Sequence, residues 1–246
     1  MTPLYRNREQ EAAIQNALMT RLQARYERAL RKEIGVRMVK AADMYQQFGD
    51  IGVDMAMGGH KEALEGILTG LWTTAMTTFA KRIEPGGKSR KTGIIEAAIR
   101  MWFQRYAYDV IVSLRNTTIQ QVREIITAGI GGGLSQSLIG KKIEQVAPQL
   151  SAYRANVIAR TETHGASQYG SISGAREIDS TLKKEWISVE DGRTRTIPFD
   201  HAGADGEIVP LDKDFTRTGE SLEYPGGPGG SAGNVINCRC VIGYVR

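Results

Sequence analysis

The sequence has few cysteines, histidines and prolines, and it lacks any long hydrophobic run. Its 246 residues include two cysteines, three histidines and seven prolines. Two cysteines exclude a disulfide framework and fit a reducing compartment. No apolar run approaches the roughly 20 residues of a membrane span, and the polar N-terminus lacks the apolar core of a signal peptide. We therefore expect a protein that is made and kept in a cytoplasm, or inside a particle assembled there, with no membrane partner.

Positive charge is concentrated in the first three quarters of the chain. The formal net charge is +5, but residues 186–246 hold six Lys and Arg against nine Asp and Glu. A basic surface attracts the phosphates of DNA without reading its sequence, whereas a solvated helix face has the same composition. The candidate contacts to double-stranded DNA are Arg21, Arg25, Arg28, Arg31, Lys32, Lys88, Arg90 and Lys91.

Hydrophobic periodicity predicts that the N-terminal part is helical. Apolar residues recur every three or four positions over most of residues 8–178, which is the spacing of one helix face. Gly35 is a candidate interruption of the first helix, residues 50–59 are expected to form a loop, and Pro148 is expected to end a helix. The glycine cluster at 129–133 is interpreted as a helix C-cap. The expected helices cover residues 8–48, 60–79, 92–127, 135–146 and 149–178.

Small side chains line one face of the last of these helices. Ala155, Ala159, Thr163, Ala166, Gly170 and Gly174 recur at helical spacing. Such a line lets a helix lie close against a neighbouring element. Beyond residue 179 the composition changes to short strands and turns, including segments around Trp186 and at 208–209. The expected fold class is α+β, with long N-terminal helices followed by a small C-terminal domain of helix and antiparallel sheet.

The tail carries both cysteines, directly after a glycine- and proline-rich loop. Residues 235–245 are rich in Val, Ile, Cys and Tyr and predict a β-strand. Alternation along that strand would place Cys238 and Cys240 on its more apolar face, as reduced and buried thiols. A metal site is the weaker alternative, because it needs a further ligand such as His201 or His164.

The polar residues of the second half allow two interpretations. Glu162 flanks the small-residue helix face and needs a partner, for which Arg193, Arg195 and Arg239 are the candidates. One hypothesis is an acid–base pocket of Glu162, His201 and Arg193. The other, which we favour, is a network of ion pairs that fastens loops onto a small sheet. His60 is expected at the surface.

A set of motif residues in the second half resembles the phage Mu protein F-like minor head proteins. The resemblance covers about residues 130–246 and depends on the order of the motifs together. The residues that carry it are Arg160, Glu162, Trp186, Asp191, Arg193, Arg195, His201, Tyr224, Asn237, Cys238, Arg239 and Cys240.

The resemblance implies a head morphogenesis protein of a tailed phage. Charge and periodicity predict a basic helical region over residues 1–130, and the resemblance implies an α+β head-morphogenesis domain over 131–246. A minor capsid protein of this kind is expected inside the virion or at its portal vertex, with portal protein, other head proteins and packaged double-stranded DNA as partners. Its roles would lie in head assembly, DNA packaging or retention, or genome ejection. No cofactor is expected, and the motif residues would serve the structure and not catalysis. The alternative is an enzyme delivered with the genome, centred on Glu162 and His201.

Overall fold

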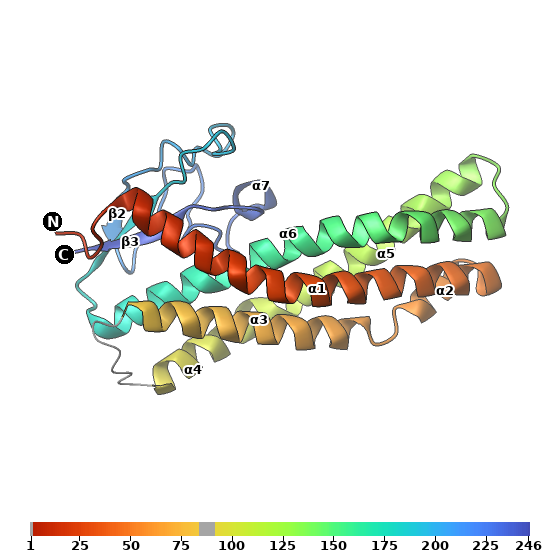
Figure 1. Ribbon diagram of the computed structural model, residues 1–246, viewed down its shortest axis with the longest axis horizontal. Helices are drawn as coiled ribbons and strands as arrows, with labels where there is room; N and C mark the ends of the chain where they lie inside the picture. The colour runs from red at the N-terminus through yellow and green to blue at the C-terminus, as the bar shows by residue number, and fades with distance from the viewer. Residues whose placement is uncertain (1, 84–91) are drawn as a thin grey trace. The chain divides into compact units, whose positions relative to one another are not determined.

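A computed structural model of the chain describes residues 2–83 and 92–246, and it confirms the α+β class (Figure 1). The long helices come first in the chain, and a small antiparallel sheet follows them. The helices are α1 (Arg8–Phe48), α2 (Asp50–Ala56), α3 (His60–Arg82), α4 (Thr92–Trp102), α5 (Tyr108–Gly131), α6 (Gln136–Ile178) and α7 (Ala232–Val235), with a π-helical turn η1 (Phe103–Ala107) between α4 and α5. The strands are β1 (Lys183–Ile187), β2 (Ile208–Pro210) and β3 (Val241–Val245).

Two compact units share the long helices. The first unit consists of Met1–Ala24, Gly70–Trp102 and Arg160–Arg246, and the second consists of Arg25–Thr69 and Phe103–Ala159. Helices α1, α3 and α6 therefore each contribute residues to both units. The segments 1–130 and 131–246, which the sequence suggested as domains, are each divided between the units.

The sheet of the first unit has the strand order β2-β1-β3, with both pairings antiparallel. Successive residues of β1 face opposite sides. Trp186 belongs to a buried cluster with Phe215, Leu222 and the two cysteines. Ile187 packs on the other side with Val241, Ala12 and Phe79. Because both faces are covered, every residue of β3 is buried.

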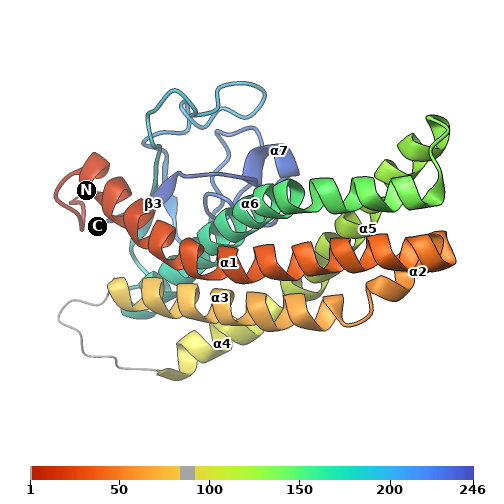
Figure 2. The same cartoon turned by 45° about the vertical axis from the view of Figure 1, so that its right-hand side comes forward.

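The two ends of the chain lie side by side, as Figures 1 and 2 both show. Pro3 forms an antiparallel bridge with Val245. The amide of Thr2 donates to the carbonyl of Arg246 at 2.9 Å, and the reverse bond has the same length. These bonds satisfy backbone groups at the edge of β3, which would otherwise be open to pairing with another chain.

Two predicted helix boundaries are wrong. Helix α6 runs without a break through Pro148, although the sequence predicted that a helix would end there. Helix α2 occupies part of the segment predicted as a loop. In both places tertiary packing outweighs local preference. The helix turn that contains Pro148 is held by burial of Ile143 and Ala147.

Glycines in this fold mark close approaches between helices. A methyl group added at Gly52 would lie 2.1 Å from the carbonyl oxygen of Met44, so the residue permits the sharp join between α1 and α2. Gly35 does not interrupt α1. In the first unit, methyl groups at Gly170 and Gly174 would lie 2.4 and 2.6 Å from the carbonyl oxygens of Met76 and Ala80. The predicted close-packing face of the small-residue helix is thereby confirmed against α3.

Candidate functional site

The motif residues of the tail gather around Trp186, the central residue of the small sheet. Its ring makes edge contacts with the rings of His201 and Phe215, each with centroids 5.4 Å apart. The indole Nε1 donates to Ser188 Oγ at 3.1 Å, and Ser188 in turn donates to the carbonyl of His201. Burial of a large ring at the centre fixes the loops that cross it.

The two cysteines precede strand β3, so the predicted strand over 235–245 is too long. The chain forms α7 and then a turn, in which Asn237 adopts a φ of 59°. Asn tolerates this left-handed conformation better than most residues. Both thiols are buried and reduced as predicted, at 2% and 4% exposure. Their burial comes from the loops packed over Trp186 and not from strand alternation.

The structure brings His201 together with both cysteines. The Nδ1 atom of His201 lies 3.7 Å from Cys238 Sγ and 3.5 Å from Cys240 Sγ. On the other side of the ring, Nε2 lies 2.7 Å from Oδ1 of Asn234. The sequence had named these three residues as weak metal candidates. It had missed Asn234, which stands in the small helix α7 and gives no motif signal of its own.

An ion-pair network fastens the loop after β1 to the segment before β3. Arg239 forms a bidentate pair with Asp191, in which Nη2 lies 2.7 Å from Oδ1. This bond to Arg239 holds the pKa of Asp191 well below its usual range. Arg193 pairs with the same carboxylate at 3.2 Å. The network supports the interpretation of the polar residues as fasteners between loops.

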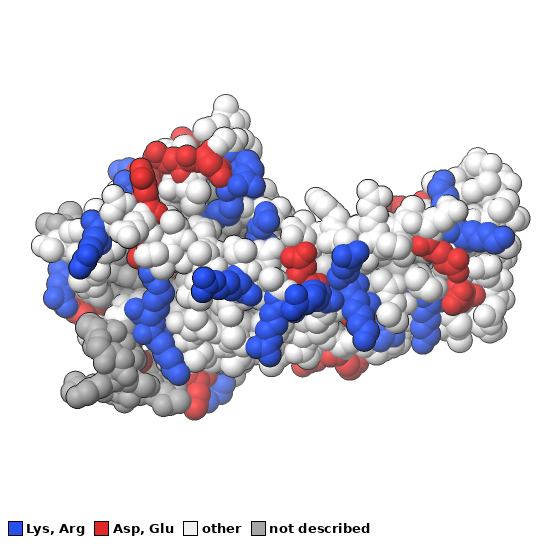
Figure 3. Space-filling view, viewed as in Figure 1, with Lys and Arg blue, Asp and Glu red and all other residues white. Residues whose placement is uncertain are grey.

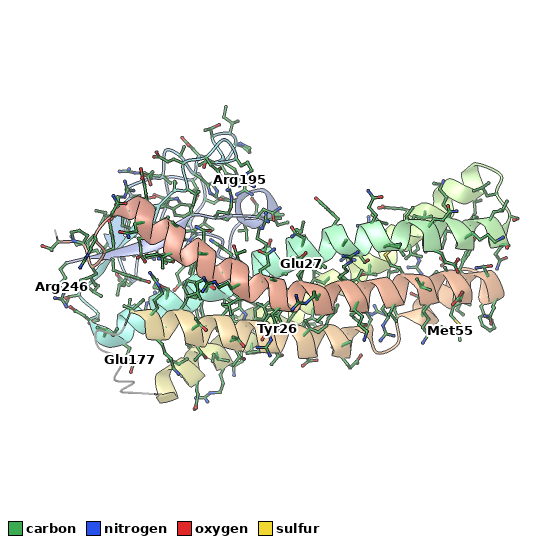
Figure 4. All side chains as sticks on the ribbon, in the orientation of Figure 1. Tyr26, Glu27, Met55, Glu177, Arg195 and Arg246 are labelled. Atoms are coloured by element: carbon green, nitrogen blue, oxygen red, sulfur yellow. The ribbon has the colours of Figure 1, made fainter. Side chains whose placement is uncertain are left out.

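Arg195 adds a second fastening point. Its guanidinium donates to the backbone carbonyls of Asn234, at 3.2 Å, and of Ile236. Figure 4 shows the labelled Arg195 beside α7. A guanidinium fork that spans two carbonyls fixes the position of the turn that carries the cysteines.

Glu162 has a partner other than the three arginines that the sequence proposed. Its carboxylate accepts a hydrogen bond of 2.9 Å from Nε1 of Trp72. Burial raises the pKa of Glu162 from 4.5 to about 7, against the opposing effect of that bond. The hydrogen bonds of Glu162, His201 and Arg193 therefore lead to different partners, and none of them joins two members of the hypothetical acid–base pocket.

His164 is a further residue of the site whose role the sequence did not reveal. Its Nε2 donates to the carbonyl of Cys240 at 2.8 Å, and burial lowers the pKa of the ring to about 4. A methyl group at Gly226, where φ is +72°, would lie 2.4 Å from Nδ1 of His164. Gly226, which follows Tyr224 and Pro225, is thus needed for both conformation and space. The adjacent Tyr224 is buried, with its ring 6.0 Å from that of Tyr169.

Exposed cations lie along α1. Arg21, Arg25, Arg28 and Lys32 follow one another at intervals of three or four residues, which puts them on one helix face. Arg31 is also exposed, to one side of that face. Figure 3 shows the basic side chains that gather over α1. Among the described residues, no carboxylate forms an ion pair with any of these five cations. The other candidates, Lys88, Arg90 and Lys91, lie outside the described residues.

His60 is buried, so the expectation of a surface position is wrong. In the second unit its Nδ1 lies 2.9 Å from Glu33, and its Nε2 lies 3.4 Å from Thr118. Burial lowers the pKa of the ring, although the bond to Glu33 opposes this effect. The position at the start of α3 suggested exposure, but α1 and α5 supply the partners.

No helix within residues 2–83 and 92–246 has the length and apolar character needed to cross a membrane.

The remaining half-buried motif residue, Arg160, lies in α6 one turn before His164.

Comparison with known proteins agrees with the motif residues. No curated protein and no solved structure matches the chain. The family model described as Phage Mu protein F like protein matches residues 120–243, which is half of the sequence. The match includes Trp186, the Asp191 turn, His201 and both cysteines. The chain therefore belongs to the Phage Mu protein F like family, and it is a phage protein of head morphogenesis.

Proposed function

We propose that the chain is a minor capsid protein of a tailed phage that binds portal protein and packaged double-stranded DNA. Its place would be the capsid interior or the portal vertex, and its role would lie in head assembly, DNA packaging or retention, or genome ejection. Family membership supports the head assignment. The observation that carries the DNA contact is the row of exposed cations on one face of α1.

The row of cations has the features expected of nonspecific phosphate contact. Arg25, Arg28 and Lys32 lie on successive turns of the part of α1 that belongs to the second unit. Their charges are not neutralised by ion pairs within the described chain. A protein that neutralises several phosphates binds DNA with an affinity that falls steeply with salt concentration.

Reversal of three charges tests the DNA contact. We expect the triple variant R25E, R28E and K32E to bind duplex DNA more weakly for all sequences, with a salt dependence reduced by about 2–3 in the slope of log K against log salt. Binding is measured by fluorescence anisotropy at several salt concentrations. The matched control reverses Arg105, Lys141 and Lys142, which are also exposed in the second unit. Equal weakening by both triples would show that only net charge matters, and unchanged binding by the first would refute the DNA contact.

Association with the head is tested separately. We expect the protein to be present in purified particles and to co-purify with portal protein from infected cells. A particle preparation that lacks the protein, together with failure to bind purified portal protein, would refute the proposed place in the virion. This result would be independent of the DNA measurement, because it uses the unaltered chain.

A further inference from the structure

One ring nitrogen faces two buried sulfurs in the core of the first unit. His201 Nδ1, Cys238 Sγ and Cys240 Sγ all lie within 4.8 Å of one another, and the three residues are between 2% and 4% exposed. A neutral imidazole nitrogen offers one lone pair, which accepts one S–H bond. Hydrogen bonding to the ring therefore satisfies one of the two thiols, and Ser188 Oγ, 3.8 Å from Cys240 Sγ, is the other acceptor within reach.

The hydrogen bonds behind His201 orient its ring as in a metal ligand. Asn234 Nδ2 donates to Glu220 Oε2 at 2.9 Å and to Thr218 Oγ1 at 3.3 Å. The amide oxygen of Asn234 is thereby turned towards His201 and accepts the Nε2–H at 2.7 Å. That tautomer leaves the lone pair of Nδ1 directed at the sulfurs. Ligating histidines characteristically donate their other N–H to an oxygen in this way.

The two separations between nitrogen and sulfur fit a tetrahedral ion. Zinc–sulfur bonds of about 2.3 Å and a zinc–nitrogen bond of about 2.05 Å place N and S about 3.6 Å apart at the tetrahedral angle. The observed separations from Nδ1 are 3.5 Å to Cys240 and 3.7 Å to Cys238. The distance from Nδ1 to each sulfur therefore suits one shared ion, and the two sulfurs lie within 4.8 Å of each other.

We propose that His201, Cys238 and Cys240 form a binding site for one zinc ion. A donor set of two thiolates and one imidazole binds zinc in preference to magnesium or calcium. Both thiols lose their protons on binding. The ion would join the loop after β1 to the turn before β3, and so would stabilise the folded C-terminal part of the first unit.

A reactive cysteine is the main competing interpretation. The order of sulfur, imidazole and amide resembles the Cys-His-Asn arrangement of thiol hydrolases. A nucleophile has to reach a substrate, however, and both sulfurs belong to a closed core cluster with Trp186, Phe215 and Leu222. Burial thus favours a structural ion.

Metal analysis of the full chain tests the proposal. The protein is produced in zinc-supplemented medium, freed of any affinity tag, and analysed by elemental mass spectrometry. We expect about one zinc per chain, and loss of that zinc in each of the variants C238A, C240A and H201A. The control H164Q alters a buried histidine that contacts the same turn through the carbonyl of Cys240, and it should retain zinc. Retention of zinc by all three ligand variants would overturn the proposal.

Two measurements on the unaltered chain remain informative if a variant fails to fold. Cobalt substituted for zinc should give the intense charge-transfer absorption of thiolate ligation. A chelator should expose both thiols to alkylation and lower the melting temperature by on the order of 10 °C. A chain that takes up neither zinc nor cobalt after reduction, or whose thiols react at the same rate with and without chelator, would overturn the proposal. So would a disulfide between the two cysteines in the freshly isolated protein.

Discussion

Replacement of Glu162 by glutamine should stabilise the protein in a pH-dependent manner. The carboxylate lies against the indole of Trp72, and burial raises its pKa from 4.5 to about 7. The folded state therefore favours the protonated form. The stability that this carboxyl supports is complete below pH 4.5, and it is lost as the pH rises through 7. The difference between the two pKa values corresponds to about 3 kcal/mol at a pH well above 7.

The glutamine amide cannot ionise but keeps an oxygen that accepts the bond from Trp72. We expect E162Q to match the original chain at pH 4.5 and to exceed its free energy of unfolding by up to about 3 kcal/mol at pH 8.5. Urea unfolding followed by tryptophan fluorescence at a series of pH values measures the difference. The control E144Q changes an exposed glutamate of the same helix and should differ by less than about 0.5 kcal/mol at any pH. A variant that is less stable than the original at pH 8.5 would show that Glu162 is ionised and well solvated, and would refute the reasoning.

Two further predictions concern the ion pair between Asp191 and Arg239 and the close approach of α6 to α3. D191N should lower the free energy of unfolding by about 1–2 kcal/mol at neutral pH, because Arg239 loses its charged partner. Since the pKa of Asp191 is lowered in the fold, this deficit should shrink as the pH falls below 3.8, and a constant deficit would contradict the ion pair. G170A should cost about 1–3 kcal/mol, because its methyl group would clash with the backbone of α3. G66A, with open space around it in α3, should stabilise by about 0.5–1 kcal/mol in the same urea assay, and equal effects of the two substitutions would contradict the close approach.

Local sequence patterns were sufficient for most elements. Apolar periodicity is repeated many times along a long helix, so α1, α3 and the run from α4 to α5 follow from it. The patterns failed where a local signal competed with packing. Proline at 148 disfavours a helix by about 3 kcal/mol or more, and the burial of neighbouring residues in α6 outweighs it. The composition of residues 50–59 suggested a loop, but Gly52 is needed for a helix that approaches α1.

The candidate site was likewise predicted only in part from the sequence. Motif order was enough to identify the family and to name His201, Cys238, Cys240 and the charged turn at Asp191. The contacts of those residues could not be predicted, because partners such as Glu162 and Trp72 stand 90 positions apart. Sequence also gave no sign of Asn234, whose side-chain amide, in α7, accepts the hydrogen bond that orients His201.

By itself, the sequence determined the helical content, the family and the reduced state of the two thiols, because these depend on composition and on patterns that repeat along the chain. Only the tertiary structure decided which groups meet. It gathered one imidazole and two sulfurs from segments more than 30 residues apart, and it paired Glu162 with an indole where the sequence suggested an arginine. The physical reason is that burial and hydrogen-bond partners depend on contacts between segments that are distant in the sequence. Such contacts leave no periodic pattern in the sequence.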